Sequence, residues 1–255
     1  MTPEFIVYPD PPSLADAVAG RLVTHLVELT DRGAVAHLGL TGGGPGIAVL
    51  RSLATSGVRD SVPWQRLHLW WSDERFLPAG DPERNDAQAG AALLAGLDRP
   101  GVTVHPMPAS DGPYGTDADA AAEAYATLLA SYAPAGQPTP EFDILLLGMG
   151  GEGHVASIFP ESPAAVDTRT VVAVRHCPKP PPTRLSFTFP TLQRAREVWI
   201  VTAGAAKADA VSLVAAGAGP VQVPAAGARG TRRTLFLIDR EAAAGLPADL
   251  RTRPV

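Results

Sequence analysis

The chain has 255 residues, of which 45% are hydrophobic and 18% are charged, and its formal net charge at pH 7 is −5. No apolar run approaches the roughly 18 residues of a membrane-spanning helix, and no run of lysine or arginine exceeds two residues. We therefore expect neither a membrane nor a nucleic acid as partner. Length leaves one or two domains open, but no linker or repeat divides the sequence, so we expect a single domain over residues 1–255.

The first residues and the cysteine content indicate a reducing compartment. The segment MTPEFIVYPD lacks the basic start and apolar centre of a signal peptide, and Cys177 is the single cysteine. We expect a cytoplasmic protein without a structural disulfide. A monomer is expected, with a dimer as the alternative. Basic residues are almost all arginine, which draws attention to the two lysines, Lys179 and Lys207.

The first half of the chain predicts alternating strands and helices. A strand over 5–8 precedes a helix capped by Ser13, whose apolar face is made by Leu14, Ala17, Val18, Leu22, Leu26 and Leu29. An apolar strand over 34–41 ends in GGGPG and leads into a helix near Ile47. A further strand over 67–72 ends in DER.

The second half of the chain continues this alternation. It predicts helices over 85–97 and 117–132, a strand over 142–149 that ends in GGEGH, and strands over 171–174, 185–189, 198–202 and 234–238. Continuous apolar strands with helical crossovers indicate an α/β fold with a mostly parallel sheet and helices on both faces. Ligands of such sheets bind outside the carboxyl ends of the strands, where the three polar loops would meet. The sequence therefore predicts a site at this edge.

The glycines of TGGGPG favour an anion at the first loop. They follow a strand and precede a helix, so backbone N–H groups and a helix N-terminus can face an anion with no Cβ atom between them. The segment matches neither a P-loop nor a dinucleotide fingerprint. The alternative is a tight turn without a ligand.

The acids and the base of DER are predicted to divide between two sides of a strand. Side chains alternate along a strand, so Asp73 and Arg75 would point one way and Glu74 the other. One acid and one base would then face the site together. The alternative is a solvated cluster of charges on a loop.

The third loop carries Glu152 and His154. A histidine can accept a proton near neutral pH, and a carboxylate can orient and support it. Alternatively, His154 caps the following turn and Glu152 is solvated. No HExxH motif is present and the other histidines fall on separate elements, so no metal site is predicted; these are His25, His37, His68, His105 and His176.

A fourth segment, 179–211, supplies two cations. Arg184 opens a strand after a run of prolines, and Lys207 lies near a helix start. Together they can bind an anion, the arginine as a fork and the lysine as a point charge. The alternative is that both are solvated.

Four loops, TGGGP, SDER with a following RN, GMGGEGHVASIFP and PPPTR…GAAKADAV, resemble in order and spacing those of 6-phosphogluconolactonases, the hydrolases of the oxidative pentose phosphate pathway. The resemblance covers nearly the whole chain and is strongest to the actinobacterial branch. It implies a Rossmann-like α/β fold related to glucosamine-6-phosphate deaminase. It also implies hydrolysis of a phosphosugar lactone, 6-phospho-D-glucono-1,5-lactone, to 6-phosphogluconate without a metal or cofactor.

The resemblance also implies roles for single residues. His154 would be the general base that activates water, with Glu152 and Asp73 as further catalytic residues. The residues expected to bind the phosphate are Thr41, Gly43, Gly44, Arg75, Arg184 and Lys207. Family members often carry Asp where this chain has Glu152, and SGGS where it has TGGG, so the reach of the longer carboxylate is open. The oxyanion donors would be N–H groups of the glycine loops or Arg75.

Two other functions compete with lactone hydrolysis. An amino-sugar phosphate deaminase of the same fold would carry DEY in place of DER and a glutamate where this chain has Phe159. A non-catalytic sugar-phosphate sensor would need a DNA-binding segment, for which the residues before the first helix leave no room. Both features favour the hydrolase.

Overall fold

The computed structural model describes residues 2–31, 33–97 and 101–252. Its main sheet contains β1 (Glu4–Tyr8), β2 (Ala36–Leu40), β3 (Leu67–Trp71), β5 (Thr103–Val104), β6 (Ile144–Gly148), β9 (Glu197–Thr202), β10 (Arg233–Asp239) and β11 (Arg251–Thr252). A second sheet contains β4 (Asp73–Arg75), β7 (Val171–Val174) and β8 (Arg184–Phe187). The helices are α1 (Pro11–Thr30), α2 (Gly44–Thr55), α3 (Asn85–Ala92), α4 (Ala118–Ser131), α5 (Phe189–Leu192) and α6 (Ala208–Ala215).

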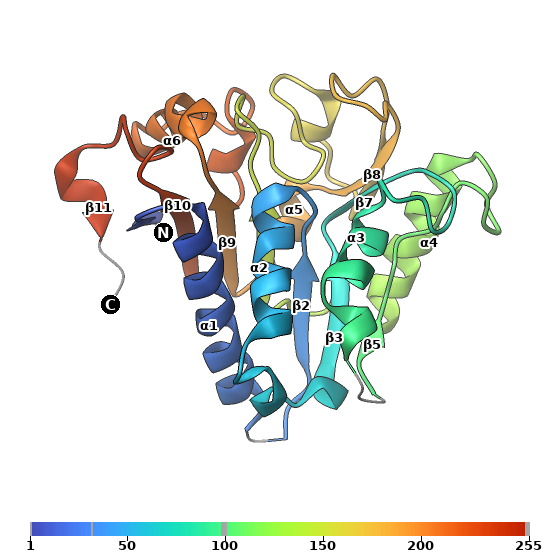
Figure 1. The fold of residues 1–255 in the computed structure, drawn as a ribbon. Coiled ribbons are helices and arrows are strands. Elements are labelled where there is room, and N and C mark those ends of the chain that lie inside the picture. Colours follow the sequence, from blue (N-terminus) through green and yellow to red (C-terminus); the bar gives the residue numbers. More distant parts are fainter. Residues whose placement is uncertain (1, 32, 98–100, 253–255) are drawn as a thin grey trace.

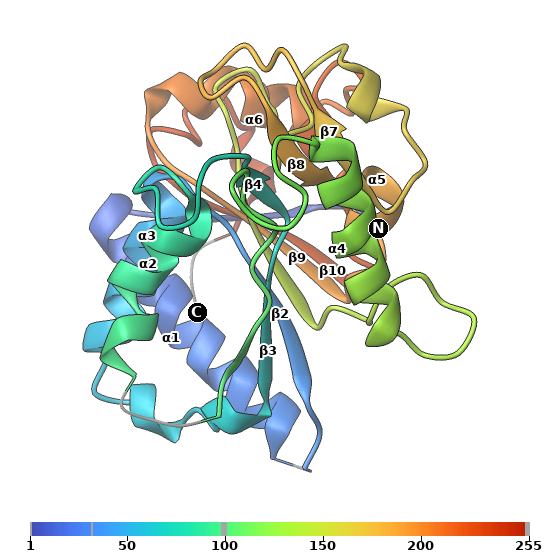
Figure 2. The ribbon, with the colours of Figure 1, turned by 90° about the vertical axis from the view of Figure 1, so that its right-hand side faces the viewer.

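Every neighbouring pair in the main sheet is parallel, which confirms the predicted fold class. The strand order is β11-β1-β10-β9-β6-β2-β3-β5. Helices α1, α2 and α3 cover one face and α4 and α5 the other, as Figure 2 shows from the side. Helix α6 packs into the same apolar cluster as α4 and α5.

The apolar run of β6 is continuous because this central strand is buried on both faces. Ile144 and Leu146 belong to the apolar cluster under α1, α2 and α3, whereas Leu145 and Leu147 belong to the cluster under α4, α5 and α6. All four side chains are buried. The run therefore indicates a strand between two layers of helices.

The direction of the chain crossovers reverses between β2 and β6. From β2 the chain proceeds through α2 to β3 on one side, and from β6 it proceeds to β9 on the other. The two strands pair only at Leu38↔Ile144 and Gly39↔Leu145. Beyond these pairs their loops part and leave a crevice at the carboxyl ends, the place where open α/β sheets bind ligands.

The second sheet was not predicted. The chain turns after Trp71, so that residues 73–75 form the separate strand β4 instead of extending β3. β4 pairs antiparallel with β8, and β8 with β7. Ser72 accepts a hydrogen bond from the Phe187 N–H at 2.8 Å, which links the two sheets. In Figure 1, β7 and β8 lie beyond the carboxyl ends of β2 and β3. Asp73 and Arg75 of β4 and Arg184 of β8 line the pocket at this edge.

Two predicted helix boundaries were wrong. Helix α1 is capped by Asp10, whose carboxylate accepts the Ser13 N–H at 2.8 Å, because two prolines fit the first turn that follows. Helix α3 ends at Ala92, and a 3-10 turn over Leu94–Gly96 replaces its predicted last turn. Further 3-10 turns lie at Arg59–Ser61, Trp64–Arg66, Pro163–Ala165, Ala205–Lys207, Pro224–Ala226 and Ala248–Leu250.

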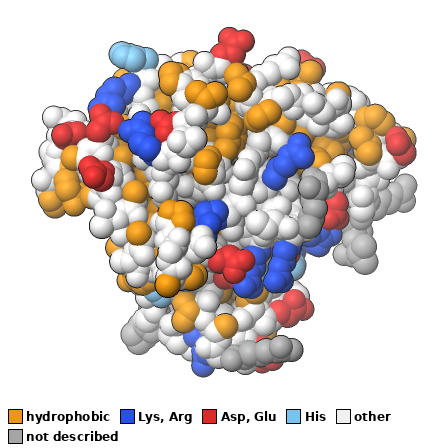
Figure 3. Space-filling model, turned by 180° about the vertical axis from the view of Figure 1, so that it is seen from behind, with side chains coloured by type: hydrophobic (Ala, Val, Ile, Leu, Met, Phe, Trp, Pro, Cys, Tyr) orange, Lys and Arg blue, Asp and Glu red, His pale blue; other side chains and the backbone are white. Residues whose placement is uncertain are grey.

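The surface seen in Figure 3 carries acidic and basic side chains close to one another. No broad basic area covers this face among the residues drawn in colour. In the described part of the chain, none of the helices has the length and apolar character needed to cross a membrane.

Two glycine-to-alanine substitutions are expected to change stability in opposite directions. A Cβ on Gly39 would lie 2.0 Å from Leu145 Cδ2, so Gly39→Ala should lower the free energy of unfolding by about 1–3 kcal/mol. A Cβ on the exposed helical Gly20 meets no atom within 4 Å, so Gly20→Ala should raise it by about 0.4–1 kcal/mol. Urea denaturation at unchanged m-value measures both, and a Gly39→Ala midpoint at or above wild type would contradict the close strand approach.

Candidate active site

A pocket of about 240 Å³ lies in the crevice between the β2 and β6 loops. Of the residues predicted for the site, all except Glu152 line it: Thr41, Gly43, Gly44, Asp73, Arg75, His154, Arg184 and Lys207. Gly42, Gly150, Asn85 and Lys179, which were not predicted as site residues, line it as well. The structure thus brings all four loops to one place.

The glycine loop presents bare backbone at the N-terminus of α2. Gly43 caps this helix with a φ of 81°, a value that favours glycine, and a Cβ on Gly43 or Gly44 would meet no atom within 4 Å. Thr41 links the two central loops, because its hydroxyl accepts the Gly148 N–H at 3.1 Å and donates to the Gly42 carbonyl at 3.3 Å. Unsatisfied N–H groups and the helix dipole together suit an anion.

His154 is held by Glu152. Its Nδ1 lies 2.8 Å from Glu152 Oε1, and its ring packs against Phe159 at a centroid distance of 4.5 Å. The Nδ1–H tautomer donates to the carboxylate and leaves Nε2 as the proton acceptor. Glu152 therefore reaches the histidine despite its extra methylene group, while its side chain stays 34% exposed to solvent.

Lys179 is the second partner of Glu152 and was missed as a site residue. Its Nζ lies 2.8 Å from Glu152 Oε2. The hydrogen bond from His154 holds the pKa of Glu152 well below its ordinary range, and the bond from Lys179 lowers it further while burial opposes both. The only available signal was that Lys179 is one of two lysines in the chain.

The DER strand divides as the alternation predicts. Asp73 and Arg75 line the pocket, whereas Glu74 is fully buried on the other side. Asp73 accepts a hydrogen bond from the Ser157 hydroxyl at 2.7 Å, and a second, longer one from Asn85 Nδ2. These carboxylates are buried, so the solvated-cluster alternative is wrong.

Glu74 ties β4 to the start of α3. Its carboxylate accepts the backbone N–H groups of Arg75, Asn85 and Asp86 at 2.7, 2.6 and 2.9 Å. Burial raises the pKa of Glu74 to about 7, against the attraction of Arg84 at 3.8 Å. The acid that faces away from the pocket therefore fixes the strand whose other side chains line it.

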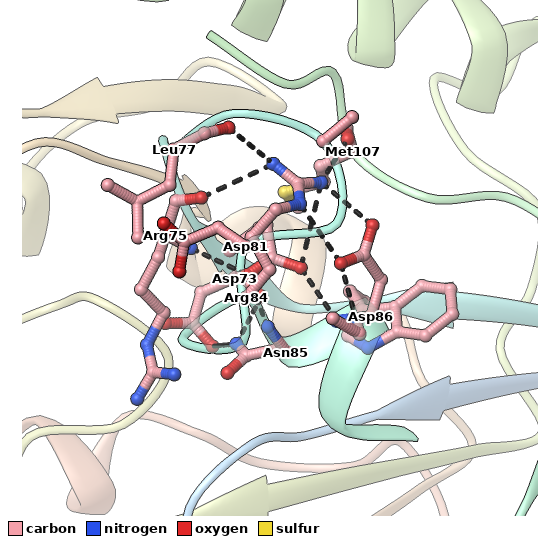
Figure 4. A network of polar contacts seen from close by, with 12 residues as sticks. Asp73, Arg75, Leu77, Asp81, Arg84, Asn85, Asp86 and Met107 are labelled. Carbon is pink, nitrogen blue, oxygen red and sulfur yellow. Dashed lines mark hydrogen bonds and ion pairs between the residues drawn. The ribbon is translucent and has the colours of Figure 1, made fainter. Parts of the chain in front are cut away.

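Arg84, which is 1% exposed, is the centre of a polar network beneath β4 (Figure 4). It donates to both carboxylate oxygens of Asp86, at 3.0 and 2.8 Å, and to the carbonyls of Leu77 and Met107 at 3.2 and 2.8 Å. The next residue, Asn85, donates to the Asp73 carbonyl at 2.8 Å. The RN that follows SDER was noticed in the sequence, but its role was not predicted.

The cations of the pocket differ in how they are held. Arg75 Nη1 donates to the Glu83 carbonyl, and Arg184 donates through Nε and Nη2 to carbonyls of residues 179–181. Burial lowers the pKa of Lys207, and the charge of Lys179 lowers it further. No hydrogen bond to a described residue holds the Lys207 ammonium, so it is available to an anion in the pocket.

Three of the remaining histidines meet away from this pocket; His105 is buried, and His37 and His68 are half-buried. His68 Nδ1 lies 2.9 Å from His105 Nε2, and His37 accepts a hydrogen bond from Trp70 Nε1 at 3.1 Å. Burial lowers the pKa of His37 and His105 to about 4, which keeps both rings neutral. Within the described ranges, no group of three or more His, Cys, Asp and Glu side chains is arranged to hold a metal ion.

A parallel α/β sheet whose switch-point pocket combines glycine backbone at a helix N-terminus, basic side chains and a carboxylate-held histidine is typical of enzymes that act on anionic small molecules. The family described as glucosamine-6-phosphate isomerases/6-phosphogluconolactonase matches residues 9–237, and the chain belongs to this family.

Relatives named 6-phosphogluconolactonase match nearly the full chain. The chain is 51% identical over 252 residues to the 6-phosphogluconolactonase of Streptomyces coelicolor, a match that covers 98% of this chain and 97% of the relative. It is 50% identical to that of Mycobacterium tuberculosis, over 97% of this chain and 100% of the relative. The solved 6-phosphogluconolactonase of Trypanosoma brucei is similar with a TM-score of 0.81 at 29% identity, over 96% of this chain and 99% of that structure.

Gly150→Ala is expected to separate Glu152 from His154. A Cβ at this position would lie 2.1 Å from His154 Nδ1 and 2.6 Å from Glu152 Oε2. The ¹⁵N shifts of the His154 ring should then change from a single Nδ1–H tautomer to a mixture. Gly90→Ala, where a Cβ meets nothing within 4 Å, is the matched control and should keep the wild-type spectrum. An unchanged His154 tautomer in Gly150→Ala would contradict this geometry.

Proposed function

We propose that this enzyme hydrolyses 6-phospho-D-glucono-1,5-lactone to 6-phospho-D-gluconate, a step of the oxidative pentose phosphate pathway. The observation that carries the proposal is the 2.8 Å contact between Glu152 and His154, with His154 lining the same pocket as the glycine loop at the N-terminus of α2. Relatives that share half of its residues and are named 6-phosphogluconolactonase support the choice of substrate.

Water addition to the lactone requires one base and one site for the negative charge. His154 Nε2 takes a proton from water as the water oxygen bonds to the lactone carbonyl carbon. Glu152 stabilises the resulting imidazolium through Nδ1–H. When the tetrahedral intermediate collapses, the bond from that carbon to the ring oxygen breaks, and His154 returns the proton to this oxygen. N–H groups of the glycine loops or Arg75 would stabilise the oxyanion.

The phosphate is proposed to bind at the N-terminus of α2. Thr41, Gly43 and Gly44 supply the cradle, and we assign the closest ionic contact to Lys207 because its ammonium has no described partner. Arg75 and Arg184 complete the positive wall, although two nitrogen atoms of Arg184 already donate to loop carbonyls. Asp73, fixed by Ser157 and Asn85, would accept a hydrogen bond from a substrate hydroxyl.

The competing deaminase reaction lacks a proton relay here. Phe159, at the position where such enzymes would carry a glutamate, is 3% exposed and packs on the His154 ring. An apolar ring supports the imidazole sterically but transfers no proton. The sensor alternative predicts substrate binding without turnover.

We further propose a cytoplasmic monomer. Cys177 is buried, and burial raises the pKa of its thiol, so an unpaired cysteine suits a reducing compartment.

His154→Ala should lower kcat by about 10²- to 10⁴-fold, since it removes the base. Acid release from freshly made 6-phosphogluconolactone measures this, with ammonia release from glucosamine 6-phosphate as the parallel assay. His25→Gln, on the distant helix α1, should retain wild-type turnover. A fall of less than about tenfold in His154→Ala would remove the general-base role, and activity in the ammonia assay alone would overturn the proposed reaction.

Lys207→Ala should raise KM by about 10-fold or more while kcat changes little, because a charge-assisted contact to phosphate is lost. Lys207→Arg keeps the charge and should recover most of the affinity. If KM and kcat/KM of Lys207→Ala both match wild type, Lys207 does not bind the phosphate.

A further inference from the structure

Each oxygen of the Glu152 carboxylate has its own charged or chargeable partner. Oε1 lies 2.8 Å from His154 Nδ1, and Oε2 lies 2.8 Å from Lys179 Nζ. The carboxylate therefore bridges the proposed base and a permanent cation. A lone carboxylate would strongly favour the protonated imidazole, whereas a shared one favours it less.

Lys179 reaches this position from a fixed loop. Arg184, which is 5% exposed, donates from Nη2 to the carbonyls of Lys179 and Pro180, both at 3.1 Å. The Cys177 N–H donates to the Pro182 carbonyl at 3.0 Å and closes the loop. A buried guanidinium thus sets the backbone of Lys179, which distinguishes this residue from an unconstrained surface lysine.

The other charged side chains of the pocket act on Glu152 and His154 without a hydrogen bond to either residue. They come from β4, β8 and the 3-10 turn before α6, and they are Asp73, Arg75, Arg184 and Lys207. Asp73 is bonded to Ser157, and Arg184 to the loop carbonyls. Lys207 is the second ammonium in the pocket, so its removal should shift the His154 equilibrium in the same direction but less.

We propose that Lys179 is a positioning residue of the reaction proposed above: it holds Glu152 against His154 Nδ1 and takes up part of the carboxylate charge. The inference rests on His154 acting as the base. Because the side chains of Lys179 and Glu152 are 48% and 34% exposed, solvent weakens the effect, which should shrink at high salt.

The first test is an NMR titration of His154 in the free enzyme, with His154→Gln identifying its signal among the six histidines. Lys179→Met should raise the titration midpoint by about 0.5–1 pH unit, and Lys179→Arg should restore it. In a Glu152→Gln background, Lys179→Met should leave the His154 midpoint unchanged, because the carboxylate that links Lys179 to His154 is absent. A midpoint within about 0.2 unit of wild type, or an equal shift in the Glu152→Gln background, would overturn the proposal.

The second test is the pH profile of kcat. One unit below the wild-type midpoint, Lys179→Met should lose about 3- to 9-fold in kcat, whereas the alkaline plateau should change less than about twofold. Lys207→Met, the matched control, should mainly raise KM. A pH-independent rise in KM for Lys179→Met without a displaced acid limb would instead make Lys179 a substrate contact and refute the positioning role. Since the titration needs no substrate, a shifted midpoint in a protein that does not hydrolyse the lactone would refute the proposed reaction alone.

Discussion

The reversal of crossovers between β2 and β6 is the constraint on which the site depends. Neighbouring parallel strands whose chains leave in opposite directions cannot cover the gap between their own loops. Glycine-rich backbone lies on both sides of this gap, and the Thr41 hydroxyl bridges it by accepting the Gly148 N–H. The anion cradle and the His154 loop therefore face each other as a direct result of topology.

The side of the pocket that β4 forms depends on a buried cation, Arg84. Strand β4 has three residues and belongs to a small sheet, so its own ladder holds it weakly. Arg84 compensates from below by donating to carbonyls of the segment after β4 and to Asp86 at the start of α3. A buried guanidinium with its donors satisfied fixes backbone in one arrangement, whereas a buried ion with a missing partner costs several kcal/mol. Arg84, which does not line the pocket, thus helps to fix the orientation of Asp73, which does.

Periodicity and loop chemistry predicted the parts of the molecule that are local. The sheet, the facing of Asp73 and Glu74, and the meeting of the loops follow from strand alternation and from parallel strands ending at one edge. The pairing of β4 with β8 and the Lys179–Glu152 contact join residues far apart in sequence. The Arg84 network lies mostly within one segment, but its contacts depend on loop turns that no periodic pattern predicts. The predicted cap at Ser13 was wrong because Pro11 and Pro12 form the first turn of α1, which places the cap at Asp10.

The scarcity of lysine has a chemical consequence. Both ε-amino groups of the chain line the same pocket, and the lowered pKa of Lys207 leaves more of its amine in the nucleophilic free-base form. Acylation, aldehyde cross-linking or enzymatic acetylation of a lysine side chain would therefore always modify a residue of the proposed substrate pocket. For covalent immobilisation or labelling of this protein, carboxyl or engineered thiol chemistry is the suitable route, and bound substrate should protect against amine reagents.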